Sequence, residues 1–200
     1  YLAVAGGINI PRVMGSRATY TKARIGGLEG RALRKGDILR TAAARPLTRR
    51  ARISAAHLPA YGSRIELRVI LGPQDDCFTE GGIHTFLQSD YTVSIQADRM
   101  GYRLEGTPIP HRRKADIISD GLPLGAVQVP GDGLPIVLLA DRQTTGGYTK
   151  IATVISVDIP ELAQTKPGDQ VRFRRISENE AVTALQEYER KTQTAKNSSA

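Results

Sequence analysis

The sequence predicts a mainly β protein whose strands close into a barrel or stack as a sandwich. Its 200 residues include 20 Gly and 11 Pro but no Trp, and this composition favours turns and short strands over a helical bundle. The apolar runs are short, irregularly spaced and separated by Gly, Pro and Asp, as in closed barrels and sandwiches. With 40% apolar residues, the chain can fill the core of one large or two small domains.

The first sixty residues predict part of a β module. Residues 1–5 (Tyr-Leu-Ala-Val-Ala) are typical of an apolar strand. They include neither an initiating Met nor a signal-peptide pattern, so we expect further residues upstream in the natural protein. A Gly-Asp turn before an alternating strand occurs at residues 34–40 and again at 166–173. The two patterns indicate the ends of two similar β modules, the first of which is incomplete here.

The middle of the chain predicts a β-rich domain with one short helix. Residues 67–71 are typical of a strand that Gly72-Pro73 ends, and Asp75 or Asp76 is expected to cap a helix reaching toward Leu87. Further strands are predicted at residues 91–96, 102–105, 126–129, 135–140 and 151–157.

The C-terminal segment predicts a helix followed by a polar tail. Ser177-Glu-Asn-Glu180 is a capping box that opens a helix through about residue 189. Val182, Leu185 and Tyr188 lie on its apolar side. The last ten residues are polar and are expected to be disordered.

Composition disfavours several kinds of site. Cys77 is the single cysteine, which excludes an internal disulfide or a zinc cluster and suits a reducing, cytoplasmic compartment. His57, His84 and His111 lie far apart without metal-ligand spacing, so no metal site is expected. There is no run of eighteen apolar residues, so no membrane-spanning helix is expected.

The net charge of +8 is concentrated near the start of the chain. Residues 1–60 contain twelve Lys and Arg against two acids, Glu29 and Asp37. A basic segment can bind nucleic acid, but here single bases alternate with Gly, Ala and Leu, and Tyr20 is the one aromatic residue among them. No stacking platform follows from this pattern. We expect a basic surface that faces a missing segment or a partner subunit.

The stretch Asp141-Arg-Gln-Thr-Thr-Gly-Gly-Tyr148 is the strongest candidate for a functional site. It follows the apolar run 135–140, so a rigid strand leads directly into a series of hydrogen-bonding side chains. The two glycines allow the backbone to approach a ligand closely. The alternative interpretation is a tight hairpin at Gly146-Gly147.

Two further polar clusters accompany this stretch. Asp98-Arg-Met-Gly-Tyr-Arg-Leu-Glu-Gly106 contains an acid beside a guanidinium, which is either a surface ion pair or a carboxylate-binding group. Arg99 and Arg103 both offer the fork-shaped donors that suit a carboxylate. Gln128-Val-Pro-Gly-Asp-Gly133 leads into the strand before Asp141, and its glycines are typical of a turn.

Nine motifs along the chain resemble the allophanate hydrolase subunit 2/KipA family, which includes the C subunit of bacterial 5-oxoprolinase. The chain is also similar to the carboxyltransferase region of urea carboxylase. Besides the three clusters above, the motifs are Tyr1-Leu-Ala-Val-Ala-Gly-Gly-Ile8, Gly15-Ser-Arg17, Gly26-Gly-Leu-Glu-Gly-Arg31, Gly72-Pro-Gln-Asp-Asp76, Ser89-Asp-Tyr-Thr-Val93 and Ala115-Asp-Ile-Ile-Ser119. Members usually have a Trp where this chain has Cys77. Members also carry a further N-terminal segment, so the resemblance implies that this chain is truncated there.

The resemblance implies a cyclophilin-like β-barrel that occurs twice in the full subunit. Residues 1–58 are then the C-terminal part of the first barrel, residues 59–177 the complete second barrel, and residues 178–200 a C-terminal helix and tail. The family implies a KipI-like partner (the B subunit) and, for 5-oxoprolinase, a LamB/YcsF-like partner (the A subunit).

The resemblance implies that the chain belongs to an amidohydrolase that opens 5-oxoproline to glutamate with ATP hydrolysis. Two alternatives stay open: a biotin-dependent carboxyltransferase (or allophanate hydrolase subunit 2) that takes carboxybiotin and urea or a related amide, and a KipA-like regulator that binds its KipI-like partner. The chain has no Walker-type phosphate-binding motif, so ATP is expected to be bound elsewhere in the complex.

The site hypothesis brings the polar clusters together at one mouth of the second barrel. Asp141 accepts a proton or a hydrogen bond from the substrate amide, Arg99 holds a carboxylate or an oxyanion, and Asp98 completes the catalytic group. The residues expected to shape the pocket for a small amide are Gln143, Thr144, Thr145, Gly146, Gly147, Tyr148 and Asp132.

Overall fold

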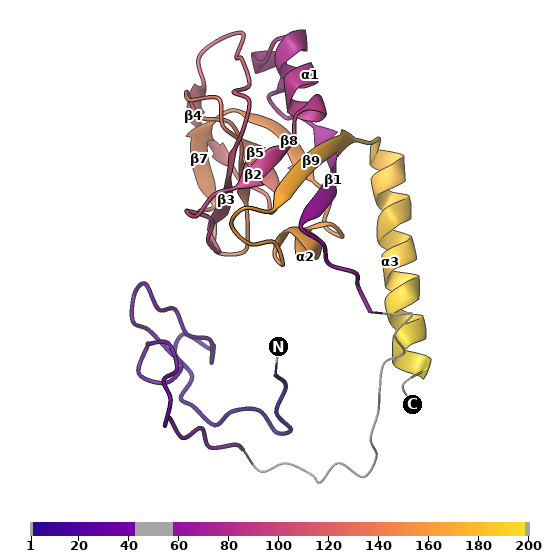
Figure 1. Cartoon of the computed structure of the whole chain (residues 1–200). Coiled ribbons are helices and arrows are strands. Elements are labelled where there is room, and N and C mark those ends of the chain that lie inside the picture. Colours follow the sequence, from indigo (N-terminus) through magenta and orange to yellow (C-terminus); the bar gives the residue numbers. More distant parts are fainter. Residues whose placement is uncertain (1, 43–57, 199–200) are drawn as a thin grey trace. The chain divides into compact units, whose positions relative to one another are not determined.

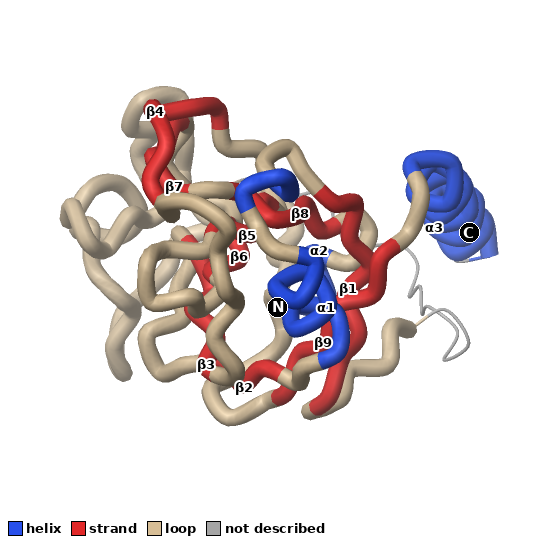
Figure 2. Tube along the Cα trace, turned by 90° about the horizontal axis from the view of Figure 1, so that it is seen from above, coloured by secondary structure: helices blue, strands red, loops and turns tan. Residues whose placement is uncertain are grey.

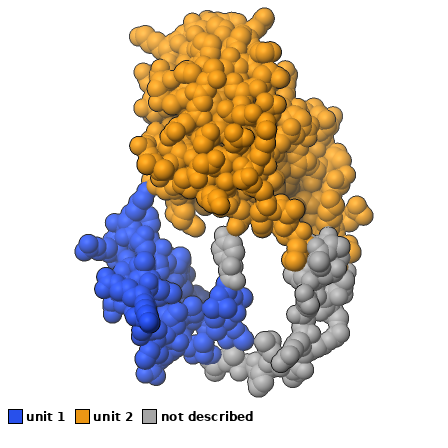
Figure 3. Space-filling view, viewed as in Figure 1, with its two compact units in different colours: residues 1–52 blue, residues 53–200 orange. Residues whose placement is uncertain are grey.

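The computed structural model describes residues 2–42 and 58–198. The chain divides into two compact units, residues 1–52 and residues 53–200 (Figure 3). The predicted boundaries after residues 58 and 177 stay predictions. The assignment of the first unit to a further barrel stays a prediction.

The first unit consists of turns and isolated bridges in its described part. Residues 2–42 contain no helix or multi-residue strand, and the longest-range bridge joins Ile8 to Thr41. The strands predicted at residues 1–5 and after Gly36 are therefore wrong for the described residues. Leu2 is 90% exposed and Ile38 is 83% exposed, because the described residues do not cover these side chains.

The predicted turn around Gly36 is present and is held by a carboxylate. Asp37 accepts a hydrogen bond from the backbone N–H of Arg34 at 2.7 Å and binds the Arg31 guanidinium through both of its oxygens. These hydrogen bonds, above all those from Arg31, lower the pKa of Asp37 to about 2. Asp169 forms the matching turn in the second unit, where it accepts from the backbone N–H of Lys166 at 2.9 Å.

The second unit is a closed barrel, as the predicted fold class requires (Figures 1 and 2). Its strands follow one another around the barrel in the order β1-β8-β5-β6-β3-β2-β9. The strands are β1 (Arg64–Leu71), β2 (Tyr91–Val93), β3 (Gly101–Glu105), β5 (Ala126–Gln128), β6 (Ile136–Leu138), β8 (Lys150–Val154) and β9 (Gln170–Arg175). All the strands predicted in this unit are present, and most are shorter than predicted because turns begin earlier.

Alternation along the strands fills the barrel interior with apolar side chains. Ile65, Leu67 and Val69 of β1 point inward, beside Val171 and Phe173 of the parallel neighbour β9. Side chains that point inward in one strand lie beside inward side chains of the next, so a single core forms.

Two short helices cover the two ends of the barrel (Figures 1 and 2). Phe86 of α1 (Glu80–Gln88) stacks on Phe173 with ring centroids 4.4 Å apart. At the other end, α2 (Ile159–Leu162), which the sequence analysis did not predict, buries Leu162 completely. Both helices therefore contribute to the core.

The helix cap predicted at Asp75 or Asp76 is wrong. Those residues lie in a separate 3-10 turn (Asp75–Cys77), and α1 is capped by Thr79, whose hydroxyl accepts from the backbone N–H of Gly82 at 2.9 Å. Gly82 is required in the helix because an added Cβ would lie 2.4 Å from the carbonyl oxygen of Pro110.

A two-stranded ribbon outside the barrel is the second sheet. It pairs β4 (Asp116–Gly121) with β7 (Thr145–Tyr148) in antiparallel register, and Figure 1 shows it beside β5. Leu122, Ala126 and Leu138 form a small apolar cluster separate from the main core. Part of the predicted polar stretch after Asp141 is therefore a strand.

The C-terminal helix α3 (Glu178–Ser198) begins with the predicted capping box. The backbone N–H and hydroxyl of Ser177 both donate to Glu180 at 2.7 Å. The helix continues to Ser198, so the prediction of disorder is wrong for residues 191–198. Ala184 of this helix is buried against Ile155 and Ile176, and Ala181 packs beside them.

The apolar side predicted for α3 does not pack on the barrel. Val182, Leu185 and Tyr188 are 53%, 40% and 48% exposed, because the smaller Ala184 lies on the side that contacts the barrel. In the part of the chain that the structure describes, no helix is long and apolar enough to cross a membrane.

Candidate functional site

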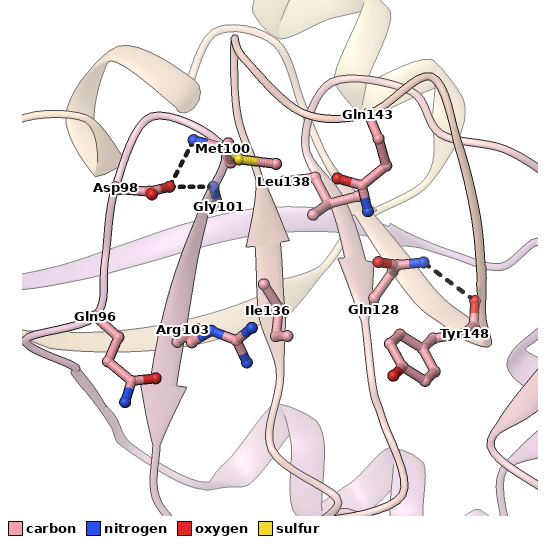
Figure 4. Close-up of a pocket in the computed structure, with 10 residues that line it drawn as sticks. All are labelled: Gln96, Asp98, Met100, Gly101, Arg103, Gln128, Ile136, Leu138, Gln143 and Tyr148. Atoms are coloured by element: carbon pink, nitrogen blue, oxygen red, sulfur yellow. Dashed lines mark hydrogen bonds between the residues drawn. The ribbon is translucent and has the colours of Figure 1, made fainter. Parts of the chain in front are cut away.

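The candidate site is a cavity on the outer face of the barrel, which we call the main cavity. Its volume is about 190 Å³. It lies over β3, β6 and β5, beside the loop before β3, the residues that lead into β7 and the last residue of β7 (Figure 4). The lining residues are Gln96, Asp98, Met100, Gly101, Arg103, Gln128, Ile136, Leu138, Gln143 and Tyr148.

Strand register explains which residues reach this face. Arg103 pairs with Ile136, and Ile136 pairs with Gln128, so these three side chains lie in one row on the same face. Their neighbours Val127 and Val137 point into the core and are fully buried. The cavity thus lies on the outer face of the sheet and not at the barrel mouth where the site was expected.

Gln128 forms the buried wall of the main cavity. Its side chain is 2% exposed, and Nε2 donates to the carbonyl oxygen of Tyr148 at 3.4 Å. The ribbon comes this close because residue 146 is glycine: an added Cβ would lie 2.9 Å from Gln128 Nε2 and 2.7 Å from Leu122 Cδ1. The close approach that Gly146 allows is therefore between the ribbon and the barrel, and not between the backbone and a ligand.

Asp98 builds the loop at the opposite wall. Its Oδ1 accepts from the backbone N–H of Met100 at 2.7 Å and of Gly101 at 3.3 Å. These bonds fix the carboxylate at the edge of the cavity, immediately before β3 (Figure 4).

Arg99 and Asp141 bind each other across two loops. The Arg99 guanidinium donates to both Asp141 oxygens, at 2.8 and 3.0 Å, and the backbone N–H of Asp141 donates to the Arg99 carbonyl at 2.9 Å. The Arg99 side chain is 78% exposed, so this pair contributes less than about 1 kcal/mol to stability. Neither residue lines the main cavity.

Of the other predicted site residues, some line the main cavity and others do not. Gln143 and Tyr148 line it. The carbonyl oxygen of Thr144 accepts a hydrogen bond from the backbone N–H of Leu122. Thr145, Gly146 and Gly147 belong to β7. Asp132 lies at a smaller neighbouring cavity, the side cavity, and its carboxylate accepts from the backbone N–H of Leu134 at 3.0 Å.

Seven lining residues were not among the predicted site residues, namely Gln96, Met100, Gly101, Arg103, Gln128, Ile136 and Leu138. The signal for the last two was present in the sequence. Residues 135–140 are apolar at consecutive positions, and a strand that is apolar on both faces indicates that something covers its outer face. The ribbon provides that cover.

A buried ion pair attaches the ribbon to the barrel. Lys150 is 1% exposed, and its Nζ donates to Asp120 Oδ2 at 2.7 Å and to the Gly121 carbonyl at 3.2 Å. The hydrogen bond from Lys150 is the main reason why the pKa of Asp120 lies below its usual value. Among the described residues, no three His, Cys, Asp or Glu side chains are grouped to hold a metal ion.

Residues 1–175 match the carboxyltransferase domain, subdomain A and B. This match covers most of the chain, both units included. The chain belongs to this carboxyltransferase-domain family. The result agrees with the resemblance drawn from the sequence motifs, and the family includes proteins with different overall reactions.

Two relatives are each named as the C subunit of 5-oxoprolinase. The one from Escherichia coli (strain K12) is 43% identical over 194 residues, which are 95% of this chain and 60% of that protein. The one from Haemophilus influenzae is 38% identical over 181 residues, which are 90% of this chain and 57% of that protein. This chain therefore spans somewhat more than half the length of these relatives.

A solved structure with the same fold is the urea amidolyase of K. lactis. It superposes with a TM-score of 0.82 at 25% sequence identity, covering 96% of this chain and 13% of that enzyme. The carboxyltransferase-domain fold is thus shared with a much larger protein.

Proposed function

We propose that this chain is part of a subunit of an ATP-dependent 5-oxoprolinase, an enzyme that opens 5-oxoproline to glutamate. The observation that carries the proposal is the 43% identity, over 95% of the chain, to a protein named as the C subunit of 5-oxoprolinase. The urea amidolyase resemblance is weaker, at 25% identity. This sequence has no Walker-type motif, so we propose that the ATP used by the complex is bound elsewhere in it or by another mode.

The lining of the main cavity supports a small cyclic amide as substrate. Gln128 and Gln143 offer amide groups, which can donate to a lactam oxygen and accept from a lactam N–H. Ile136 and Leu138 provide an apolar floor for the methylene groups of the ring. The volume of about 190 Å³ is below the roughly 300–1,000 Å³ of pockets for drug-sized ligands, so the cavity can take only a small molecule.

We assign proton transfer to Asp98 in preference to Asp141. Ring opening adds water to the lactam carbonyl, breaks the C–N bond and delivers a proton to the leaving nitrogen. Asp98 lines the cavity in which this nitrogen would lie, and Asp141 does not line it. Asp141 and Arg99 then hold the loop that carries Asp98 against the end of β6.

The complex is proposed to contain a KipI-like partner and a LamB/YcsF-like partner, in the cytoplasm. The basic excess of residues 1–60 is proposed to face one of these partners. Three of these bases, Arg49, Arg50 and Arg52, lie outside the described residues.

A carboxyltransferase reaction is the second candidate function. The family match and the TM-score of 0.82 to a urea amidolyase support it. In that reaction the cavity would take the amide that accepts a carboxyl group from carboxybiotin.

Activity of the reconstituted complex tests these two functions. The full-length subunit is purified with its KipI-like and LamB/YcsF-like partners, and glutamate formed from 5-oxoproline is measured with and without ATP. We expect ATP-dependent glutamate formation and no carboxylation of urea in the presence of carboxybiotin. Carboxylation without glutamate formation would instead establish the second candidate.

The Asp98 assignment is tested by two isosteric variants. Asp98→Asn keeps an oxygen that can accept from Met100 but removes the base, so kcat is expected to fall about 100-fold or more. Asp141→Asn is the matched control, because it removes a carboxylate outside the cavity, and kcat should fall much less. A larger loss in Asp141→Asn would return the catalytic role to Asp141.

A further inference from the structure

The main cavity adjoins the side cavity, which has a volume of about 130 Å³. Three residues line both: Gln96, Arg103 and Ile136. The two cavities are therefore neighbouring parts of one groove on the outer face of β3 and β6. Arg103 is the basic side chain that borders both parts (Figure 4).

Several arginines of the second unit are held by partners, and Arg103 is not among them; other arginines without such a partner, such as Arg113 and Arg175, line neither cavity. Arg99 is paired with Asp141, and Arg142 donates to the carbonyls of Leu122 and Leu139. The other arginines in ion pairs are Arg64 and Arg172 with Asp90, Arg68 with Asp158, and Arg174 with Glu66. Within residues 2–42 and 58–198, by contrast, the Arg103 side chain has no hydrogen bond or ion pair.

The surroundings of Arg103 suit the recognition of a carboxylate. Its guanidinium is planar and binds a carboxylate through two parallel hydrogen bonds. Gln96, at the same junction, carries an amide that can donate a further hydrogen bond. Ile136 pairs with Arg103 across the strands, so one side of the bound group would be in contact with apolar surface and shielded from water.

We propose that Arg103 binds the carboxylate of the substrate and so determines specificity for a carboxylated lactam over an uncharged amide. This inference rests on the proposed 5-oxoprolinase function. With the carboxylate at the junction, the lactam ring attached one bond away enters the main cavity, between Gln128 and Asp98. Arg99, to which the sequence analysis gave this role, instead positions the loop through Asp141.

Two lactams that differ only in the carboxylate provide the test. Binding of 5-oxoproline and of 2-pyrrolidinone, which has the same ring without the carboxylate, is measured on the reconstituted complex by calorimetry. Arg103→Gln should weaken 5-oxoproline binding about 10- to 100-fold, as expected for the loss of a charged hydrogen-bond pair. Binding of 2-pyrrolidinone should not change, and Arg103→Lys should recover part of the loss.

Arg99→Gln, in the loop before β3, is the comparison variant, and its loss of 5-oxoproline affinity should be much smaller than that of Arg103→Gln. The inference is overturned if Arg99→Gln shows the loss and Arg103→Gln does not. It is also overturned if Arg103→Gln weakens both lactams equally, since that would reflect a structural role. Failure of the proposed function is distinguishable, because the unsubstituted complex would then form no glutamate from 5-oxoproline.

Discussion

Lys150 is the most deeply buried charged side chain among the described residues, and it has a half-exposed partner. Asp120 supplies the carboxylate, at 54% side-chain exposure, and Gly121 supplies a carbonyl. Burying an ammonium is unfavourable unless it is paired and hydrogen-bonded. The pair therefore determines whether β4 can lie against the barrel near Gln128 and the main cavity.

The Lys150–Asp120 pair predicts a specific dependence of stability on pH. Because the pKa of Asp120 is lowered below its ordinary value of 3.8, the pair contributes stability that is fully present above that value. This contribution is lost as the pH falls through the lower pKa of the folded state. Urea unfolding of Asp120→Asn between about pH 6 and pH 2 should therefore show a weaker pH dependence than that of the unsubstituted chain.

The variant Lys150→Met tests the role of the lysine separately from that of Asp120. It removes the charge that lowers the Asp120 pKa, so the same part of the pH dependence should disappear. Its stability at pH 7 should nevertheless exceed that of Asp120→Asn, because Met fills the site without leaving a buried charge unpaired. Unchanged pH dependence in both variants would contradict the role given to this pair.

Helix α3 meets the barrel through small side chains, although its larger apolar residues are elsewhere on its surface. Ala184 is 9% exposed while Val182 is 53% exposed. The helix is long, and the apolar cluster that joins it to the barrel contains its small residues Ala181 and Ala184, both near its N-terminus. Its stability must therefore depend strongly on local interactions, of which the capping box is the clearest.

Removal of the helix cap is expected to lower the stability of α3 without lowering that of the barrel. Ser177→Ala loses the side-chain bond at the N-terminus, at a cost of about 1 kcal/mol, and Ser177→Asp is the control that keeps a capping oxygen. Helicity by circular dichroism and amide exchange within residues 178–195 should change in the alanine variant, while exchange in β1 and β8 should not. An equal loss of protection in the barrel would show that the helix and barrel unfold together.

The elements of the second unit divide into those determined by neighbouring residues in the sequence and those determined by tertiary contacts. The strands, the capping box and the Gly-Asp turns depend on residues close in sequence, and all of them are predicted correctly in the second unit. The ribbon is different, because β4 at Asp116 pairs with β7 at Tyr148. Its strands have little apolar alternation, so tertiary contacts with Leu122 and Lys150 decide their conformation.

The candidate site was only partly predictable for the same reason. Arg99 and Asp141 could be recognised as chemically capable groups, but nothing in the sequence indicates that they bind each other. Gln128 lies on a strand where every residue is buried, so its contact with the main cavity follows from strand pairing alone. Register across three strands is what brings Arg103, Ile136 and Gln128 together.

The two units differ in what can stabilise each of them. In the second unit, Leu67, Val127 and Phe173 belong to one core of fully or almost fully buried side chains. In the described part of the first unit, Gly30 is the one buried residue. Hydrophobic burial is the main favourable term in folding, so the stability of the chain resides in residues 53–200.

A comparison of three chains tests this distribution of stability. Residues 53–200 expressed alone should unfold cooperatively, with a Tm close to that of the main transition of the whole chain, because the described strands of the closed barrel all lie between Arg64 and Arg175. Residues 1–52 alone should show no cooperative transition, since bridges such as Ile8 to Thr41 bury little apolar surface. Differential scanning calorimetry measures both. A Tm for residues 53–200 well below that of the whole chain would show that the first unit stabilises the barrel directly, and residues 1–52 would then have to be retained in every assay of the site.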